Sequence, residues 1–169
     1  MDTLSIFFTV SIVIFTIGSF FILFKWNKKN KTKETPEKIS SLSHQMQLQA
    51  YERLTLLVDR VALPNLISRM NQSGLSAKEM QLLLIQTIKQ EFDYNITQQI
   101  YVSAEAWNAV KNLKEQTMLI INQFSSTLPQ EATGADLNKL LLEYLMNDEK
   151  GNLHELVGEA ISYEARKLL

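Results

Sequence analysis

An uncharged hydrophobic stretch of 21 residues near the start of the chain constrains its fold more than any other feature. It runs from Leu4 to Phe24 and reads LSIFFTVSIVIFTIGSFFILF. A helix of that length spans roughly 31 Å, about the thickness of the hydrocarbon core of a bilayer. We therefore expect a short tail at residues 1–3 and a single transmembrane helix at residues 4–24.

A cleaved secretory signal is the competing interpretation of this stretch. Such a signal needs a positively charged start, a shorter apolar core and small residues at a cleavage site. The chain instead begins with Met1, Asp2 and Thr3, and bulky side chains dominate positions 20–26. The stretch is therefore expected to stay attached as an anchor.

The charges on either side of the stretch predict its orientation. Asp2 is the only charged residue before the stretch, whereas five lysines follow it closely: Lys25, Lys28, Lys29, Lys31 and Lys33. Lysines beside a membrane span tend to remain in the cytoplasm, and Trp26 suits the headgroup level. The predicted topology places the N-terminus outside and the rest of the chain in the cytoplasm. The lysines also suit anionic lipid headgroups, although their role in topology already accounts for them.

Small hydroxyl side chains recur along one face of the expected anchor. They follow helical spacing together with Ile12, and they are Ser5, Thr9, Thr16 and Ser19. Small residues let membrane helices approach closely and hydrogen-bond to each other, which would make this a packing face. Alternatively, each hydroxyl bonds to a carbonyl of its own helix.

The rest of the chain is long enough for one helical domain. Residues 25–36 are interpreted as a basic polar linker and residues 37–169 as a single cytoplasmic domain. Residues 1–36 carry a net charge of +3 and residues 37–169 a net charge of −4. A mildly acidic domain lacks the basic surface that nucleic acids require. The chain has no cysteine, so disulfides, thiolate catalysis and cysteine-bound metals are excluded.

Helical spacing of apolar residues dominates this domain, and no segment alternates convincingly over strand length. A first helix is expected from Pro36 to about Leu63, followed by a short helical piece at residues 65–70. Its expected buried stripe is Leu42, Met46, Ala50, Leu54, Leu57 and Val61. The predicted fold class is all-α: one transmembrane helix followed by a compact bundle of about four to five helices.

Capping patterns indicate where the later helices begin. Ser76 and Glu79 match a capping box ahead of a broad apolar run, which predicts the central helix of the bundle. Later helices are expected to start at caps formed by Ser103, by Thr133 or Asp136, and by Asn152. Helices are expected to end at Asn95, before Pro129 and at residues 147–151.

Motifs for chemistry are incomplete in this sequence. His154 and Glu155 begin the zinc-protease pattern H-E-x-x-H, but Gly158 replaces its second histidine. The only other histidine is His44, and both are expected at the surface or at helix ends. The turn at residues 146–151 lacks the first oxygen ligand of a calcium loop. We therefore expect no metal, no cofactor and no enzyme activity, and no small-molecule substrate is evident.

Aromatic residues crowd the segment from Phe92 to Trp107, where the helical pattern breaks. As a functional interpretation, Tyr101 and Trp107 contact a protein partner, because Tyr and Trp are enriched at interface hot spots. Tyr51 is a further candidate contact. The alternative is that aromatic residues at a bend fill the corner of the core.

Two segments resemble a known protein family. Residues 91–110, EFDYNITQQIYVSAEAWNAV, and residues 51–60, YERLTLLVDR, resemble a family of small single-pass bacterial membrane proteins classed as a domain of unknown function. The resemblance covers most of the chain after the anchor, and the anchor and its lysines are similar too. It implies an inner-membrane location and no particular activity, cofactor or catalytic residue.

Together these features predict a membrane-tethered, non-enzymatic interaction or scaffold module. Its expected partners are the lipid bilayer and either another protein or a second copy of the chain. The alternative is an accessory subunit of a membrane enzyme, transporter or secretion complex that docks through its transmembrane helix.

Overall fold

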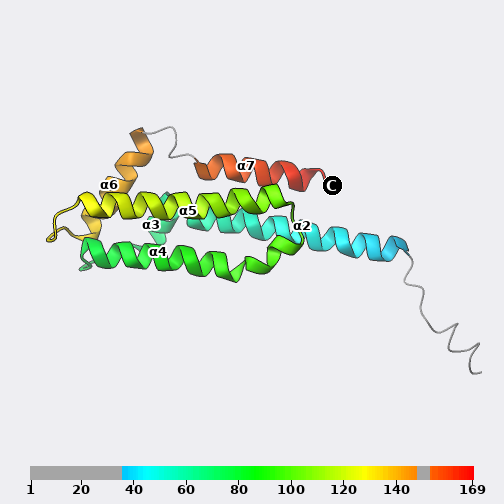
Figure 1. Ribbon diagram of the computed structural model, residues 1–169, viewed down its shortest axis with the longest axis horizontal. Coiled ribbons are helices and arrows are strands. Elements are labelled where there is room, and N and C mark those ends of the chain that lie inside the picture. The colour runs from blue at the N-terminus through cyan, green and yellow to red at the C-terminus, as the bar shows by residue number, and fades with distance from the viewer. Residues whose placement is uncertain (1–35, 148–152) are drawn as a thin grey trace, which may run out of the picture. The chain divides into compact units, whose positions relative to one another are not determined.

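The structure, a computed structural model, describes residues 36–147 and 153–169, and every regular element in these two ranges is a helix (Figure 1). The elements are α2 (Pro36–Val61), α3 (Leu63–Met70), α4 (Ala77–Tyr94), the 3₁₀-helix η1 (Ile96–Ile100), α5 (Ala104–Thr127), α6 (Gly134–Asn147) and α7 (Leu153–Arg166). The predicted all-α class is confirmed. The expected number of helices after the anchor is too low, because the described ranges alone contain six α-helices.

The break between α2 and α3 comes from Pro64. A proline has no N–H, so a helix running through it would leave the carbonyl of Arg60 without a partner. The guanidinium of Arg69 donates to that carbonyl at 2.8 Å. Ala62 leaves the helical conformation, with ψ of 128°, and α3 starts anew with the proline in its first turn. The short helical piece expected here is therefore a separate helix.

The predicted helix caps are confirmed wherever the structure describes them. At the start of α4, Ser76 Oγ accepts from the Glu79 N–H at 3.3 Å, and Glu79 Oε2 accepts from the Ser76 N–H at 2.9 Å. Ser103 Oγ accepts from the Ala106 N–H at 3.0 Å at the start of α5. Asn95 directly follows the last residue of α4. Each serine cap satisfies a backbone N–H that the start of a helix leaves unpaired.

The starts of α4 and α6 are joined through their capping residues. Thr133 caps α6 in the same reciprocal way, since Asp136 Oδ2 accepts from the Thr133 N–H at 2.8 Å. Ser76 and Thr133 form an isolated antiparallel bridge, and the Gly134 N–H donates to the carbonyl of Leu75 at 2.7 Å. Two loops far apart in the sequence therefore meet at one end of the bundle.

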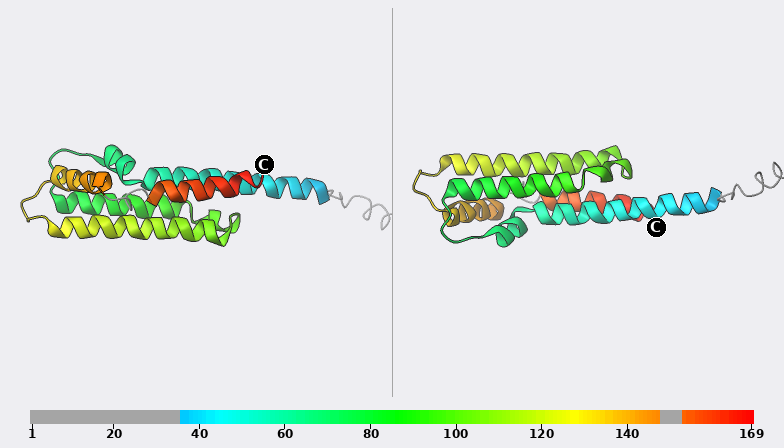
Figure 2. Two further views of the ribbon diagram at one scale, coloured as in Figure 1. Left: turned by 90° about the horizontal axis from the view of Figure 1, so that it is seen from above. Right: turned by 90° about the horizontal axis from the view of Figure 1, so that it is seen from below.

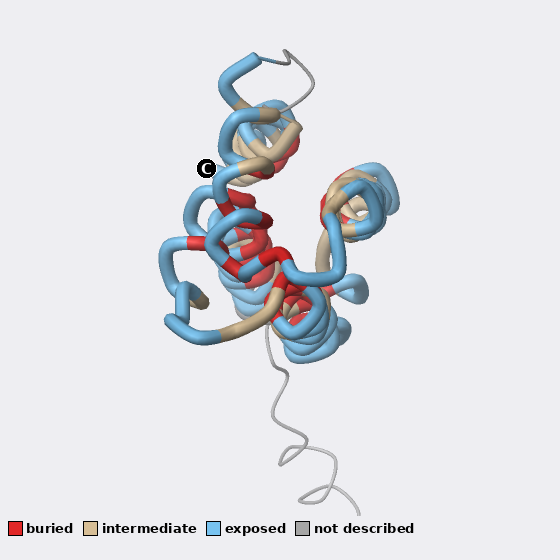
Figure 3. The backbone as a smooth tube through the Cα atoms, turned by 90° about the vertical axis from the view of Figure 1, so that its left-hand side faces the viewer, coloured by how far each residue is buried: buried red, intermediate tan, exposed pale blue. Residues whose placement is uncertain are grey.

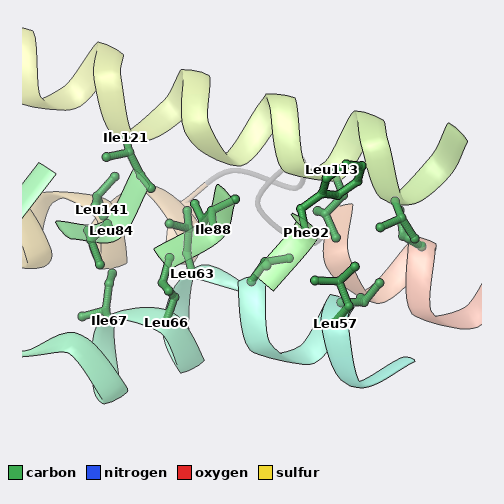
Figure 4. Packing of buried hydrophobic residues seen from close by; sticks show 14 of the residues in the cluster. Leu57, Leu63, Leu66, Ile67, Leu84, Ile88, Phe92, Leu113, Ile121 and Leu141 are labelled. Carbon is green, nitrogen blue, oxygen red and sulfur yellow. The ribbon is translucent and has the colours of Figure 1, made fainter. Parts of the chain in front are cut away.

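The core of the compact unit Leu42–Leu169 is built around α4 and α5. Helix α4 packs against α3, α5 and α6, and α7 packs against α5 (Figures 1 and 2). Leu84 and Ile88 of α4 lie beneath Ile121 of α5 in the close-up of the core (Figure 4). Buried residues follow the inner faces of the helices (Figure 3). The central position predicted for α4 is confirmed, although its Leu82 is 55 % exposed.

The buried stripe expected along α2 is only partly correct. Its later members are buried: Ala50, Leu54, Leu57 and Val61. Its first two members are not, since Leu42 is 59 % and Met46 is 41 % exposed. Helix α2 extends past the ends of α4 and α5 (Figure 2), so these early turns lack the neighbours that bury the later ones.

The membrane prediction concerns a different part of the chain. Among the helices that the structure describes, none has both the length and the apolar character to cross a bilayer. The expected transmembrane helix at residues 4–24, its hydroxyl face and the five lysines behind it all lie outside the described residues.

Candidate interaction site

Tyr51, one of the predicted partner contacts, lies in the core and joins three helices. Its side chain is buried, and its hydroxyl donates to Glu164 Oε2 of α7 at 2.7 Å. The same hydroxyl accepts from the backbone N–H of Ser103 at 3.1 Å. Ser103 Oγ also donates to Glu164 Oε2. Burial, reinforced by the hydrogen bond to Glu164, raises the pKa of Tyr51. Tyr51 is therefore occupied by contacts within the chain.

Trp107 packs against the core from a half-buried position. Its ring lies 5.0 Å from the ring of Phe92, centroid to centroid, at an interplanar angle of 35°. Lys114 Nζ lies 4.2 Å from the centroid of the same Phe92 ring. Tyr101, the third predicted contact, is also half-buried. Trp107 thus packs against Phe92 while part of its surface stays exposed, and Tyr101 also keeps part of its surface exposed.

The segment between α4 and α5 exposes apolar residues and buries a polar one. Tyr94 is 75 % exposed, Ile96 44 % and Ile100 73 %, whereas Gln98 between the isoleucines is only 9 % exposed. The Gln98 amide donates to Thr97 Oγ1 at 3.2 Å. Turning a glutamine inward and isoleucines outward is the reverse of the usual arrangement. We call Tyr94, Ile96 and Ile100 the corner surface.

A groove of about 240 Å³ borders the corner surface. It lies between α2 and the end of α4 and is lined by Arg53, Leu56, Leu57, Arg60, Glu91, Tyr94 and Asn95. Arg60 Nε lies 2.8 Å from Glu91 Oε1, and Arg69 Nη1 lies 3.4 Å from the same oxygen. Leu56 is 62 % exposed. The groove thus offers an apolar wall beside basic side chains.

A larger hollow, of about 660 Å³, lies elsewhere, between the loops that join α3 to α4 and α5 to α6. Glu131 is the only ionisable side chain that lines it. The nearby carboxylates of Glu79 and Asp136 cap helices, and hydrogen bonds from Ser76 and Thr133 lower their pKa values. These acids serve helix ends, and the hollow brings no acid and base together.

One histidine lies on the exposed surface of α2 and the other at the start of α7. His44 is exposed and its Nε2 lies 2.8 Å from the carbonyl of Leu168. His154 is half-buried in the first turn of α7. Within the described ranges, no group of three or more His, Asp or Glu residues could hold a metal ion.

Comparison with known proteins places the chain in a family. Residues 1–168 match the family described as "Family of unknown function (DUF7935)". The chain belongs to this family. No curated protein and no solved structure matches the chain. The match confirms the prediction that the chain belongs to a family of unknown function.

Sequence reasoning did not single out Ile96 and Ile100. Their signal was local: two isoleucines follow the expected helix stop at Asn95 in a segment too short to form a regular amphipathic helix. The predicted partner contacts were the aromatic residues near them instead. Which of these side chains face inward depends on the packing of η1 against α4, and spacing along the chain does not show it.

Proposed function

We propose that this protein is a membrane-tethered, non-enzymatic interaction module whose helical domain contacts a protein partner through the corner surface. The membrane anchor in this proposal is the apolar stretch at residues 4–24, and the helical domain lies on the cytoplasmic side of the inner membrane. The lysines after the anchor support that orientation.

The observation that carries the proposal is the reversed polarity of η1. A domain that acted alone would gain by burying Ile96 and Ile100 and by leaving Gln98 in water. The opposite arrangement is favourable when another protein covers the exposed isoleucines. Tyr94 adds a large side chain with a polar tip, a type common at interface hot spots.

The groove beside Tyr94 supports the same assignment. Tyr94 forms one wall of the groove, so an apolar side chain of a partner bound at the corner surface can extend into it. Tethering to a membrane confines the domain and its partner to one surface, which converts a weak contact into an effective one.

Site-specific photo-crosslinking tests the proposal. A photoreactive residue at Ile100 of the full chain, in intact cells, is expected to trap one discrete protein. The matched control is Leu119 on α5, an apolar side chain 56 % exposed and outside the corner surface. Equal trapping from both positions, or none from either, would contradict the proposed site.

The tether is tested separately. The full chain is expected to remain with membranes after alkaline carbonate extraction, and a reporter fused to Leu169 is expected to be active in the cytoplasm. A reporter active only outside the cytoplasm would overturn the orientation. A crosslink trapped from Thr9 but not from Ile100 would instead favour an accessory subunit that docks through the membrane helix.

A further inference from the structure

An exposed stripe runs along α2 on the side away from the core. Leu42, Gln49 and Leu56 are all exposed and recur every seven residues. Seven residues return almost to the same direction on a helix, so the three side chains share one line. Leu42 and Leu56 are exposed by 59 % and 62 %, respectively. This α2 stripe therefore has an apolar residue at each end and an amide at its middle.

Opposite charges flank the α2 stripe on its two sides. At about 100° per residue, Glu52 and Asp59 lie roughly 40–60° to one side of Leu56, and Arg53 and Arg60 lie as far to the other side. All four side chains are exposed. One flank of the stripe is thus acidic and the other is basic.

We propose that two copies of this chain pair in parallel through the α2 stripe. A parallel two-fold pair brings the acidic flank of each helix against the basic flank of the other, at both edges of the contact. An antiparallel pair would place Arg53 beside the other copy's Arg60, and Glu52 beside its Asp59. Charge complementarity therefore selects a second copy and its direction.

Contacts within each chain engage two of these four charged side chains and leave the other two without an ion pair in the described residues. Neither Glu52 nor Arg53 forms an ion pair in the part of the chain that the structure describes. Asp59 Oδ1 accepts from Asn65 at 2.8 Å and Arg60 pairs with Glu91. Glu52 and Arg53 are consequently the pair on which the direction of assembly depends.

The parallel direction also suits the proposed function, on which this inference rests. It brings the residue-42 ends of both helices together, so both anchors enter the same membrane from one end of the pair. A contact over about 20 residues of two helices is smaller than a standard interface, so the dimer is weak in solution and favoured when both copies share a membrane.

Cysteine crosslinking tests pairing through the α2 stripe directly, because the chain has no cysteine of its own. The full chain with Gln49→Cys, in proteoliposomes, is expected to form a disulfide dimer on mild oxidation. The matched control is Lys139→Cys on α6, where the side chain is 76 % exposed and lies outside the α2 stripe. Crosslinking of Gln49→Cys no faster than that of the control would overturn the proposal.

Charge exchange supplies a second, independent test. Glu52→Arg places basic residues at both positions 52 and 53, and Arg53→Glu places acidic residues at both. Each variant alone therefore sets like charges against each other across the parallel pair and is expected to self-associate roughly tenfold more weakly. A mixture of the two is expected to restore pairing. Circular dichroism checks that both variants remain folded. Stronger self-association of Glu52→Arg alone would indicate an antiparallel pair and would overturn the proposed direction.

The two proposals fail in different ways. A chain that is monomeric in proteoliposomes, yet still trapped by a partner from Ile100, would refute the dimer and leave the interaction module intact. A chain that dimerises through Gln49 while Ile100 traps nothing would support the dimer and remove the corner surface as the partner site.

Discussion

The hydroxyl of Tyr51 on α2 lies 2.7 Å from the carboxylate of Glu164 on α7, across 113 positions of the sequence. The backbone N–H of Ser103, which caps α5, completes the contact. One buried phenol therefore connects the first and last helices of the compact unit through the start of α5. Because the two residues are far apart in the sequence, their hydrogen bond forms only when the helices pack in the tertiary fold.

Replacing Tyr51 by phenylalanine should destabilise the domain by about 1–2 kcal/mol, because the Ser103 N–H and Glu164 each lose a hydrogen-bond partner. Urea unfolding followed by circular dichroism measures the change. Tyr94→Phe is the matched control, since Tyr94 is 75 % exposed and its hydroxyl has no hydrogen bond within the described residues. A Tyr51→Phe domain as stable as the control would show that the contact does not stabilise the fold.

Stability should also fall at alkaline pH through Tyr51. Its pKa is raised above the ordinary value of 10.0, so the folded state holds the phenol proton more tightly than the unfolded state does. The resulting stabilisation is fully present below pH 10 and is lost as pH rises through the raised pKa. The stability difference between wild type and Tyr51→Phe is therefore expected to shrink in that range. A constant difference would contradict it.

The acidic caps predict the opposite behaviour at low pH. Hydrogen bonds from Ser76 and Thr133 lower the pKa values of Glu79 and Asp136, so their stabilisation is present above the ordinary carboxylate values. It is lost as pH falls through the lowered values. Thermal unfolding of Glu79→Gln should depend less on pH below 4.5 than that of wild type. An unchanged pH profile would show that the cap does not titrate with folding.

Two neighbouring leucines on α4 should respond very differently to truncation. Leu84 is fully buried and Leu82 is 55 % exposed. Leu84→Ala is expected to cost about 2–5 kcal/mol, because it leaves a cavity beneath α5, whereas Leu82→Ala is expected to cost under about 1 kcal/mol. Denaturant midpoints compare the two. Similar losses at both positions would mean that the packing of α4 differs from the one described.

Two glycines in helices should respond in opposite directions. A Cβ at Gly134 would lie 3.0 Å from Met80 Cβ and 3.3 Å from the carbonyl oxygen of Leu75, so Gly134→Ala should destabilise by about 1–3 kcal/mol. A Cβ at Gly158 would meet only Val58 Cγ1, at 3.9 Å. Gly158→Ala should therefore stabilise α7 by about 0.5–1 kcal/mol. A melting temperature of Gly134→Ala at or above that of wild type would contradict the close approach at Gly134.

Local sequence patterns predicted the helix boundaries well. Ser76, Ser103 and Asn95 mark helix ends as expected, because a cap involves residues only a few positions apart. The periodic stripe of α2 was correct from Ala50 onward and wrong at Leu42 and Met46. An amphipathic pattern shows which face of a helix is apolar, but it does not show how far the neighbouring helices extend along that face.

The burial of the candidate contact residues could not be predicted from the sequence, for a related reason. Tyr51, an aromatic residue on a helix, looks the same in sequence whether Glu164 lies beside it or not. The inward turn of Gln98 depends on how η1 packs against α4. The burial and hydrogen bonding of these side chains depend on contacts between residues far apart in the chain. A short segment of sequence therefore does not predict them.

The sequence by itself therefore determined the all-helical class, the positions of most caps and the contrast in charge between the two parts of the chain, because these depend on neighbouring residues and on composition. The tertiary structure decided which side chains are buried, which carboxylate accepts the hydrogen bond from Tyr51 and which face of α2 stays exposed. These depend on the packing of helices from distant parts of the chain, where burial and hydrogen bonding are settled together.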